Sequence, residues 1–199
     1  QQLLGVPVDM NEVFGKLYNH ALEGDADCGG LISYNYISGE PVTGLAEGRP
    51  MFVRSANDKF NLANFMRSHL YASVGVLKIG NDILFNEEHV KVDRITGHGG
   101  LFKTKGVGQR VLAAAINSPI SVMETAGEGG AWGIALLASY LVNHEGNEAL
   151  ADFLDNHVFA GNTGVEIAPT AEDVAGFNIY IENYKRGLAI EKAAVENKN

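Results

Sequence analysis

Cysteine, proline and tryptophan are scarce in this 199-residue chain, with one, five and one copies. The single cysteine, Cys28, excludes an intrachain disulfide and argues against a cysteine-based zinc site, which fits a reducing cytoplasm. Long apolar runs are also missing, so no segment reaches the length of a transmembrane helix. The N-terminus has no basic region followed by an apolar core, as a signal peptide would. The sequence therefore predicts a cytoplasmic protein without a membrane partner.

Positive charge is also in short supply, since 15 Lys and Arg stand against 24 Asp and Glu, for a net charge of −9. This balance argues against non-specific binding to nucleic acid or to an acidic membrane. It does not exclude an anionic small ligand, because loops and helix ends bind phosphate without net positive charge. The hydrophobic fraction of 46% and the mean hydropathy of −0.02 are typical of a globular fold with a core.

Helices and strands are expected to alternate along the chain. Apolar stripes at steps of three and four residues predict helices over 9–22, 62–77, 107–116 and 131–142. Asn57 or Asp58 is expected to cap the second of these, and Thr170 with Asp173 to begin a last helix. Runs rich in β-branched and aromatic residues predict strands over 31–37, 89–96 and 120–124. This order predicts an α/β fold in which helices flank a mixed central sheet.

Two glycine-rich turns carry the most informative pattern, because each follows a predicted strand and opens into a helix. They are the segments 97–100, Gly-His-Gly-Gly, and 127–130, Gly-Glu-Gly-Gly. Glycine lets the backbone approach a ligand closely, and ligands of open α/β sheets lie beyond the carboxyl ends of the strands. Ordinary structural turns are the alternative, since such turns are common in α/β domains. Neither turn has the Gly-Lys-Ser/Thr ending of a Walker A loop or a clean dinucleotide-binding pattern.

From about Asp27 onward, the order of the segments resembles the second half of the FGGY carbohydrate kinases. Residues 95–100, Ile-Thr-Gly-His-Gly-Gly, resemble the family's Gly-Gly-Gly-Ala-Lys/Arg-Ser type loop. Residues 133–138, Gly-Ile-Ala-Leu-Leu-Ala, are similar to its Gly-Ala-Ala-Leu-Leu-Ala helix. Residues 36–41, Tyr-Ile-Ser-Gly-Glu-Pro, resemble its Gly-Glu-Arg-Thr-Pro loop, and the stretch 177–190 resembles the end of ribulokinase- and xylulokinase-like members.

The resemblance implies an actin-like ATPase (ribonuclease H-like) domain, one of two related domains that close on a nucleotide. Residues 1–199 would then be the C-terminal domain of a sugar kinase, without the N-terminal sugar-binding domain. Such an enzyme transfers the γ-phosphate of ATP to a sugar hydroxyl, here expected to be that of a ketopentose. The resemblance places the catalytic Asp, most sugar contacts and the main magnesium ligands in the other domain, so this chain alone is predicted to be inactive. The missing initial methionine favours an excised piece, and processing is the other explanation.

The nucleotide site that the resemblance implies consists of Gly97, His98, Gly99, Gly100, Leu101, Phe102, Gly127, Glu128 and Gly129. The first turn is expected to lie along the adenosine and the α-phosphate, with Phe102 flanking the base, and the second turn is expected to close the far side. His98 stands where the family has glycine, and Lys103 with Thr104 match its Lys-Ser only loosely. No catalytic or metal-binding residue is assigned.

Simpler roles are expected for several neighbours. Trp132 is interpreted as core packing, Gly133 and Ala135 as positions of close helix–sheet contact, and Glu128 as a cap of the following helix. Glu124 and Glu128 would serve acid–base chemistry only if both faced one site. Two other function classes are considered: a non-catalytic interaction or regulatory domain of the same fold, and a dinucleotide-binding oxidoreductase domain, whose N-terminal βαβ unit is not found. The sequence leaves open whether the chain forms a homodimer.

Overall fold

The structure, a computed structural model, describes residues 5, 7–92, 94–161 and 164–197. Its α-helices are α1 (Met10–Ala21), α2 (Leu62–Asp82), α3 (Val107–Ile116), α4 (Gly129–Asn143), α5 (Leu150–Phe153) and α6 (Ala171–Glu196). Its strands are β1 (Ile32–Tyr34), β2 (Met51–Val53), β3 (Ile95–Thr96), β4 (Ile120–Val122) and β5 (Val165–Ile167). Shorter 3-10 and π-helical segments are η1 (Cys28–Gly30), η2 (Pro41–Thr43), η3 (Ile83–Glu87), η4 (Gly100–Lys103), η5 (Glu124–Glu128) and η6 (Leu154–Val158).

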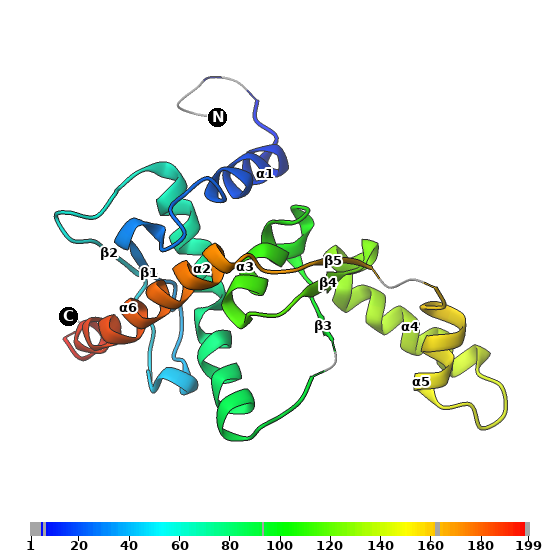
Figure 1. Ribbon diagram of the computed structural model, residues 1–199. Coiled ribbons are helices and arrows are strands. Elements are labelled where there is room, and N and C mark those ends of the chain that lie inside the picture. Colours follow the sequence, from blue (N-terminus) through cyan, green and yellow to red (C-terminus); the bar gives the residue numbers. More distant parts are fainter. Residues whose placement is uncertain (1–4, 6, 93, 162–163, 198–199) are drawn as a thin grey trace.

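The strands form two separate sheets. β1 and β2 make an antiparallel pair, in which Ile32 lies opposite Val53. The other sheet has the order β3-β4-β5, with β3 parallel and β5 antiparallel to β4, so the mixed pairing predicted from the sequence is confirmed. In Figure 1 this small sheet lies between the body around α2 and α6 and the helices α4 and α5, which project away from the C-terminus. No helix in the described ranges has the length and apolar content needed to cross a bilayer.

The core lies around α2, which packs against α1, α3, α6 and β1. Its aromatic part joins Tyr71 to Phe177 on α6, with ring centroids 4.6 Å apart, and Tyr34 on β1 to Tyr184, at 4.8 Å. The buried Arg67 donates hydrogen bonds to the carbonyl of Gly24, to the hydroxyl of Tyr71 and to the carboxylate of Asp173. This side chain therefore ties the end of α1 and the start of α6 to the centre of the domain.

The predicted helix caps agree with the structure at α6 but not at α2. Thr170 caps α6 as predicted, since its Oγ1 accepts a hydrogen bond from the N–H of Asp173 at 3.1 Å. The cap of α2 is Asn61, whose Oδ1 accepts from the N–H of Asn64 at 2.8 Å, so the expectation of Asn57 or Asp58 was wrong. Asn61 has the extended backbone of a cap directly before the first helical residue, whereas the carboxylate of Asp58 accepts from the N–H of Ser55.

The strands are shorter than predicted, and two were missed. The strand expected over 89–96 is reduced to β3, and β2 and β5 were not predicted at all. Helix α4 starts at Gly129, two residues earlier than expected, because η5 and α4 follow each other without a break. The second glycine turn is thus already helical where it meets the first.

Candidate functional site

The two glycine turns meet at one edge of the three-stranded sheet. Because β3 and β4 are parallel, their carboxyl ends lie side by side and both turns leave from the same edge. The N–H of Gly97 donates to the carbonyl of Ser121 at 2.9 Å, which continues the ladder by one residue. The N–H of Gly99 then donates to the carbonyl of Ala126 at 2.7 Å. This hydrogen bond joins the first turn directly to η5 in the second.

The two turns can approach each other closely because Gly127 and Gly129 have no side chains. A Cβ on Gly129 would lie 3.1 Å from the Cβ of His98, and one on Gly127 would lie 3.2 Å from the Cγ of Lys103. The exposed His98 and Lys103 therefore lie against the backbone of the second turn. The structure thus brings together the two segments that the sequence pattern had linked only by order.

Within the first turn, the glycines have different roles. Gly97 is buried under the ring of Phe102, which a Cβ there would overlap, so this ring packs inward against its own turn. Gly99 has φ 103° and ψ −176°, a region that only glycine populates readily, and its carbonyl accepts from the N–H of Phe102 at 3.0 Å. A Cβ on Gly100 would meet no described atom within 4 Å. The half-buried Leu101 packs against Gly108 at the start of α3.

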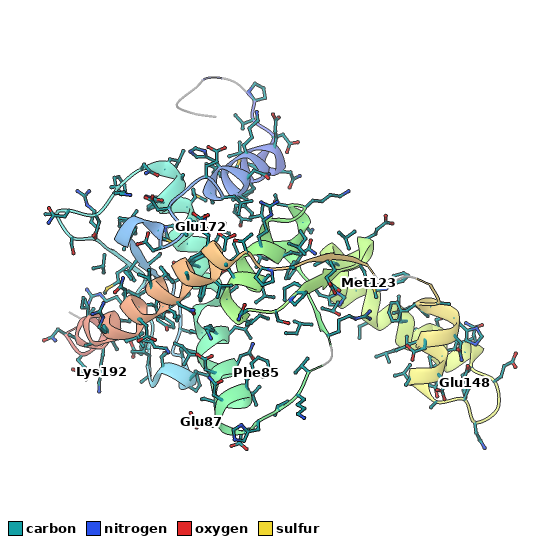
Figure 2. The ribbon with its side chains drawn as sticks, viewed as in Figure 1. Phe85, Glu87, Met123, Glu148, Glu172 and Lys192 are labelled. Carbon is teal, nitrogen blue, oxygen red and sulfur yellow. The ribbon has the colours of Figure 1, made fainter. Side chains whose placement is uncertain are left out.

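A cavity of about 350 Å³ borders β3, and a larger one, which opens to solvent, lies behind the second turn, between α4 and the segment α5–η6. We call the larger one the α4–α5 cavity. Its volume is about 450 Å³, within the range of small-molecule sites. Its described lining consists of Gly129, Gly130, Gly133, Ile134, Leu136, Leu137, Leu150, Leu154 and Phe159. Figure 2 labels Met123, where the chain leaves β4, and Glu148, on the loop that joins α4 to α5.

The roles predicted for three residues on α4 were wrong. Trp132 is 38% exposed and does not belong to the core. Gly133 and Ala135 do not serve close helix–sheet contact, because a Cβ on Gly133 would meet no described atom within 4 Å and Ala135 is exposed. The reason is that α4 projects away from the sheet, and none of its described residues is buried. The mid-helix position of Gly133 is visible in the sequence, but only the structure shows that nothing packs on it.

The charged residues near the turns include Glu124 and Glu128. Glu124 is exposed at the start of η5. Glu128 ends η5, but its side chain and the helix cap expected of it lie outside the described residues. Across the part of the chain that the structure describes, no group of three or more His, Cys, Asp or Glu side chains is arranged to hold a metal ion. The arrangement instead offers glycine-rich backbone and an apolar cavity.

Comparison with known families and structures gives this geometry a context. The sequence family described as the FGGY family of carbohydrate kinases, C-terminal domain, matches residues 8–142. No curated protein matches the chain. Similar solved structures include a xylulose kinase from Rhodospirillum rubrum, with 18% identity and a TM-score of 0.60 over 97% of this chain and 36% of that one.

Two further structures have the same fold in other kinases. A glycerol kinase from Plasmodium falciparum, solved with ADP, has 16% identity and a TM-score of 0.64 over 88% of this chain and 33% of that one. A gluconate kinase from Lactobacillus acidophilus has 22% identity and a TM-score of 0.62 over 90% of this chain and 35% of that one. This chain therefore spans about a third of the length of the structures it matches.

Proposed function

Because this chain belongs to the FGGY family of carbohydrate kinases, through the C-terminal domain that covers residues 8–142, we propose that it forms the ATP-binding half of a sugar kinase. The fold is the actin-like, ribonuclease H-like ATPase type, with a mixed sheet flanked by helices. The observation that carries the proposal is the junction of the two glycine turns at one sheet edge, through the hydrogen bond from Gly99 to Ala126.

In this proposal, the first turn, from Gly97 to Phe102, lies along the adenosine and the α-phosphate. Its open side at Gly100, where a Cβ would meet no described atom within 4 Å, supports the close approach of a phosphate to the backbone. The second turn, from Gly127 to Gly129, closes the far side, and His98 lies between the two. Phosphoryl transfer depends mainly on such positioning of the nucleotide.

We propose that the whole enzyme phosphorylates a hydroxyl group of a small sugar, a ketopentose. Support comes from the likeness to a xylulose kinase over 97% of this chain. Residues 1–199 act as the C-terminal domain in this proposal, and the sugar is held by an N-terminal domain. We also propose a cytoplasmic location, because the one cysteine, Cys28, is buried and has no second cysteine with which to form an intrachain disulfide.

No catalytic residue and no magnesium ligand is assigned to this chain. The proposal places the catalytic Asp and the main magnesium ligands in the N-terminal domain. We therefore expect the isolated chain to bind ATP without turning it over. Phosphorylation of xylulose or ribulose by the purified chain would refute this division of labour.

Calorimetric titration of the purified chain with ATP tests the proposal. Gly100→Leu should abolish the binding heat, because the new side chain occupies the space left for the phosphate. Gly15→Leu, on α1, is the matched control, since a Cβ there also meets no described atom within 4 Å. If ATP does not bind, or if both variants bind it like the parent, the chain is better explained as a non-catalytic interaction domain of the same fold.

A further inference from the structure

We propose that the outer edge of β3 pairs with one further β-strand, supplied by the N-terminal part of the longer enzyme, an inference that rests on the proposed function. In the described part of the chain β3 ends its sheet, with β4 as its neighbour. The N–H of Gly97 donates to the carbonyl of Ser121 on β4. Because successive residues of a strand direct their backbone groups to opposite edges, the N–H and carbonyl of Thr96 point away from β4. The exposed Thr96 thus presents a donor and an acceptor to an incoming strand.

The cavity of about 350 Å³ that borders β3, which we call the β3 cavity, adjoins this edge. Its described lining includes both residues of β3 and none of β4 or β5, so it lies beside β3 and not between paired strands. Eight of the ten described lining residues are apolar, among them Phe85 of η3, which Figure 2 labels. The outward-facing backbone groups of Thr96 and an apolar hollow are therefore next to each other.

Apolar side chains at the β3 cavity are unusually exposed. Leu77 of α2, Leu84 of η3, and Val90 and Val92 of the segment before β3 all line it, and each is between 45% and 49% exposed. Single exposed apolar residues are ordinary, whereas a group of them around one hollow marks an interaction surface. An extended segment fits this surface, because it can hydrogen-bond to the strand edge while its alternate side chains enter the cavity.

The N-terminal part of the enzyme is the occupant that the observations favour. This chain spans 33–36% of the solved kinases described above, so an enzyme of that length has about two thirds of its residues outside this chain. β3 leads directly into the first glycine turn at Gly97, and a strand paired at Thr96 would therefore lie beside the proposed nucleotide site. The N-terminal part has to approach this site with the catalytic Asp. Repulsion between two copies that each carry a net charge of −9 disfavours a second copy as the occupant.

Photo-crosslinking in the full-length enzyme tests the inference. Benzoylphenylalanine in place of Val92, at the β3 cavity, should crosslink on irradiation to a peptide of the N-terminal part of the same molecule, identified by mass spectrometry. Benzoylphenylalanine in place of Val42 is the matched control, because this valine of η2 is 47% exposed and lies outside the cavity lining. No crosslink from position 92, a crosslink to a second copy, or the same crosslinked peptide from both positions would overturn the inference.

Hydrogen exchange of the Thr96 amide tests the strand pairing itself. This amide should exchange about tenfold more slowly in the full-length enzyme than in the 199-residue chain, because the added strand supplies its acceptor. Equal exchange rates would overturn the inference. Calorimetry with ATP separates the two proposals: if the chain binds ATP but position 92 gives no crosslink, the proposed function stands and this inference fails. If the chain does not bind ATP, the proposed function fails and this inference fails with it.

Discussion

Gly129 lies directly against His98, so that a Cβ on Gly129 would be 3.1 Å from the Cβ of the histidine. The two residues belong to different glycine turns, which follow the parallel, paired strands β3 and β4. Next to this contact, the N–H of Gly99 donates to the carbonyl of Ala126 at 2.7 Å. The close spacing of the two turns therefore depends on residue 129 being a glycine, which has no side chain.

A valine at position 129 should push the turns apart and weaken the hydrogen bond between Gly99 and Ala126. Hydrogen exchange of the Gly99 amide is then expected to accelerate by about two- to tenfold, which corresponds to one ordinary hydrogen bond. Gly130→Val is the control, because a Cβ at that position meets no described atom within 4 Å. Equal protection of the Gly99 amide in both variants would show that the contact with His98 does not set the spacing.

Gly99→Ala should destabilise the chain because of its backbone rather than its contacts. At φ 103° and ψ −176°, an alanine is expected to cost about 1–3 kcal/mol. Gly100→Ala should stay within about 0.5 kcal/mol of the parent, since that position has a free surface and no positive φ. Urea unfolding of the two variants measures both values. A Gly99→Ala variant as stable as Gly100→Ala would contradict the strained geometry.

Removing the guanidinium of Arg67 should lower the stability of the domain more than removing the charge of an exposed ion pair. Arg67 is 5% exposed and contacts α1, α2 and α6, whereas its partner Asp173 is partly exposed. Arg67→Met should lower the free energy of unfolding by about 2–4 kcal/mol, because Asp173 and two backbone carbonyls lose their donor. Lys59→Met, which breaks an exposed pair with Asp25, should cost less than about 1 kcal/mol. Urea unfolding measures both values. If the two variants lose a similar amount of unfolding free energy, Arg67 does not hold α1, α2 and α6 together as described.

Stability should fall at mildly acidic pH because of His69. Burial lowers the pKa of this imidazole below its usual value, and its ring packs against Phe65 while Nδ1 lies 2.9 Å from the Oγ of Ser33. The unfolded chain then takes up a proton before the folded one does. The stabilisation is present above the ordinary histidine pKa of about 6.5 and is lost as the pH falls below it.

The measurement for His69 is urea unfolding at several values between pH 7.5 and pH 5. His69→Gln should flatten the slope of stability against pH in the lower part of this window. His144→Gln is the control, because His144 is exposed and close to the solvent-facing end of α4. If both variants keep the slope of the parent, some other group is responsible.

Helix α3 was predicted to the residue, whereas the strands were not. Its apolar stripe ends at Asn117, which adopts a left-handed conformation at φ 48° and precedes Ser118 and Pro119. Such local signals are fully present in the sequence. By contrast, β2 and β5 have three residues each, too few to show a period of two. The position of β5 is fixed by distant partners, such as the amide of Gln109, whose Nε2 donates to the carbonyl of Val165 at 2.8 Å.

The candidate site was predictable in its turns and unpredictable in its cavity. Two glycine turns after parallel strands are expected to meet at one sheet edge, and Gly99 and Ala126 do meet there. The α4–α5 cavity depends on α4 leaving the sheet, which no local pattern encodes. Gly133 was therefore interpreted as close packing, and only the empty space around it revealed its different setting.

Nuclear magnetic resonance mapping of nucleotide binding tests the central claim most directly. A ¹⁵N-labelled chain would be titrated with a non-hydrolysable ATP analogue while its backbone amide shifts are followed. The account predicts that the largest shift changes fall on residues 97–102 and 127–133, with little change in β1 and β2. The absence of shift changes, or their concentration in β1 and β2 instead of the two glycine turns, would contradict it.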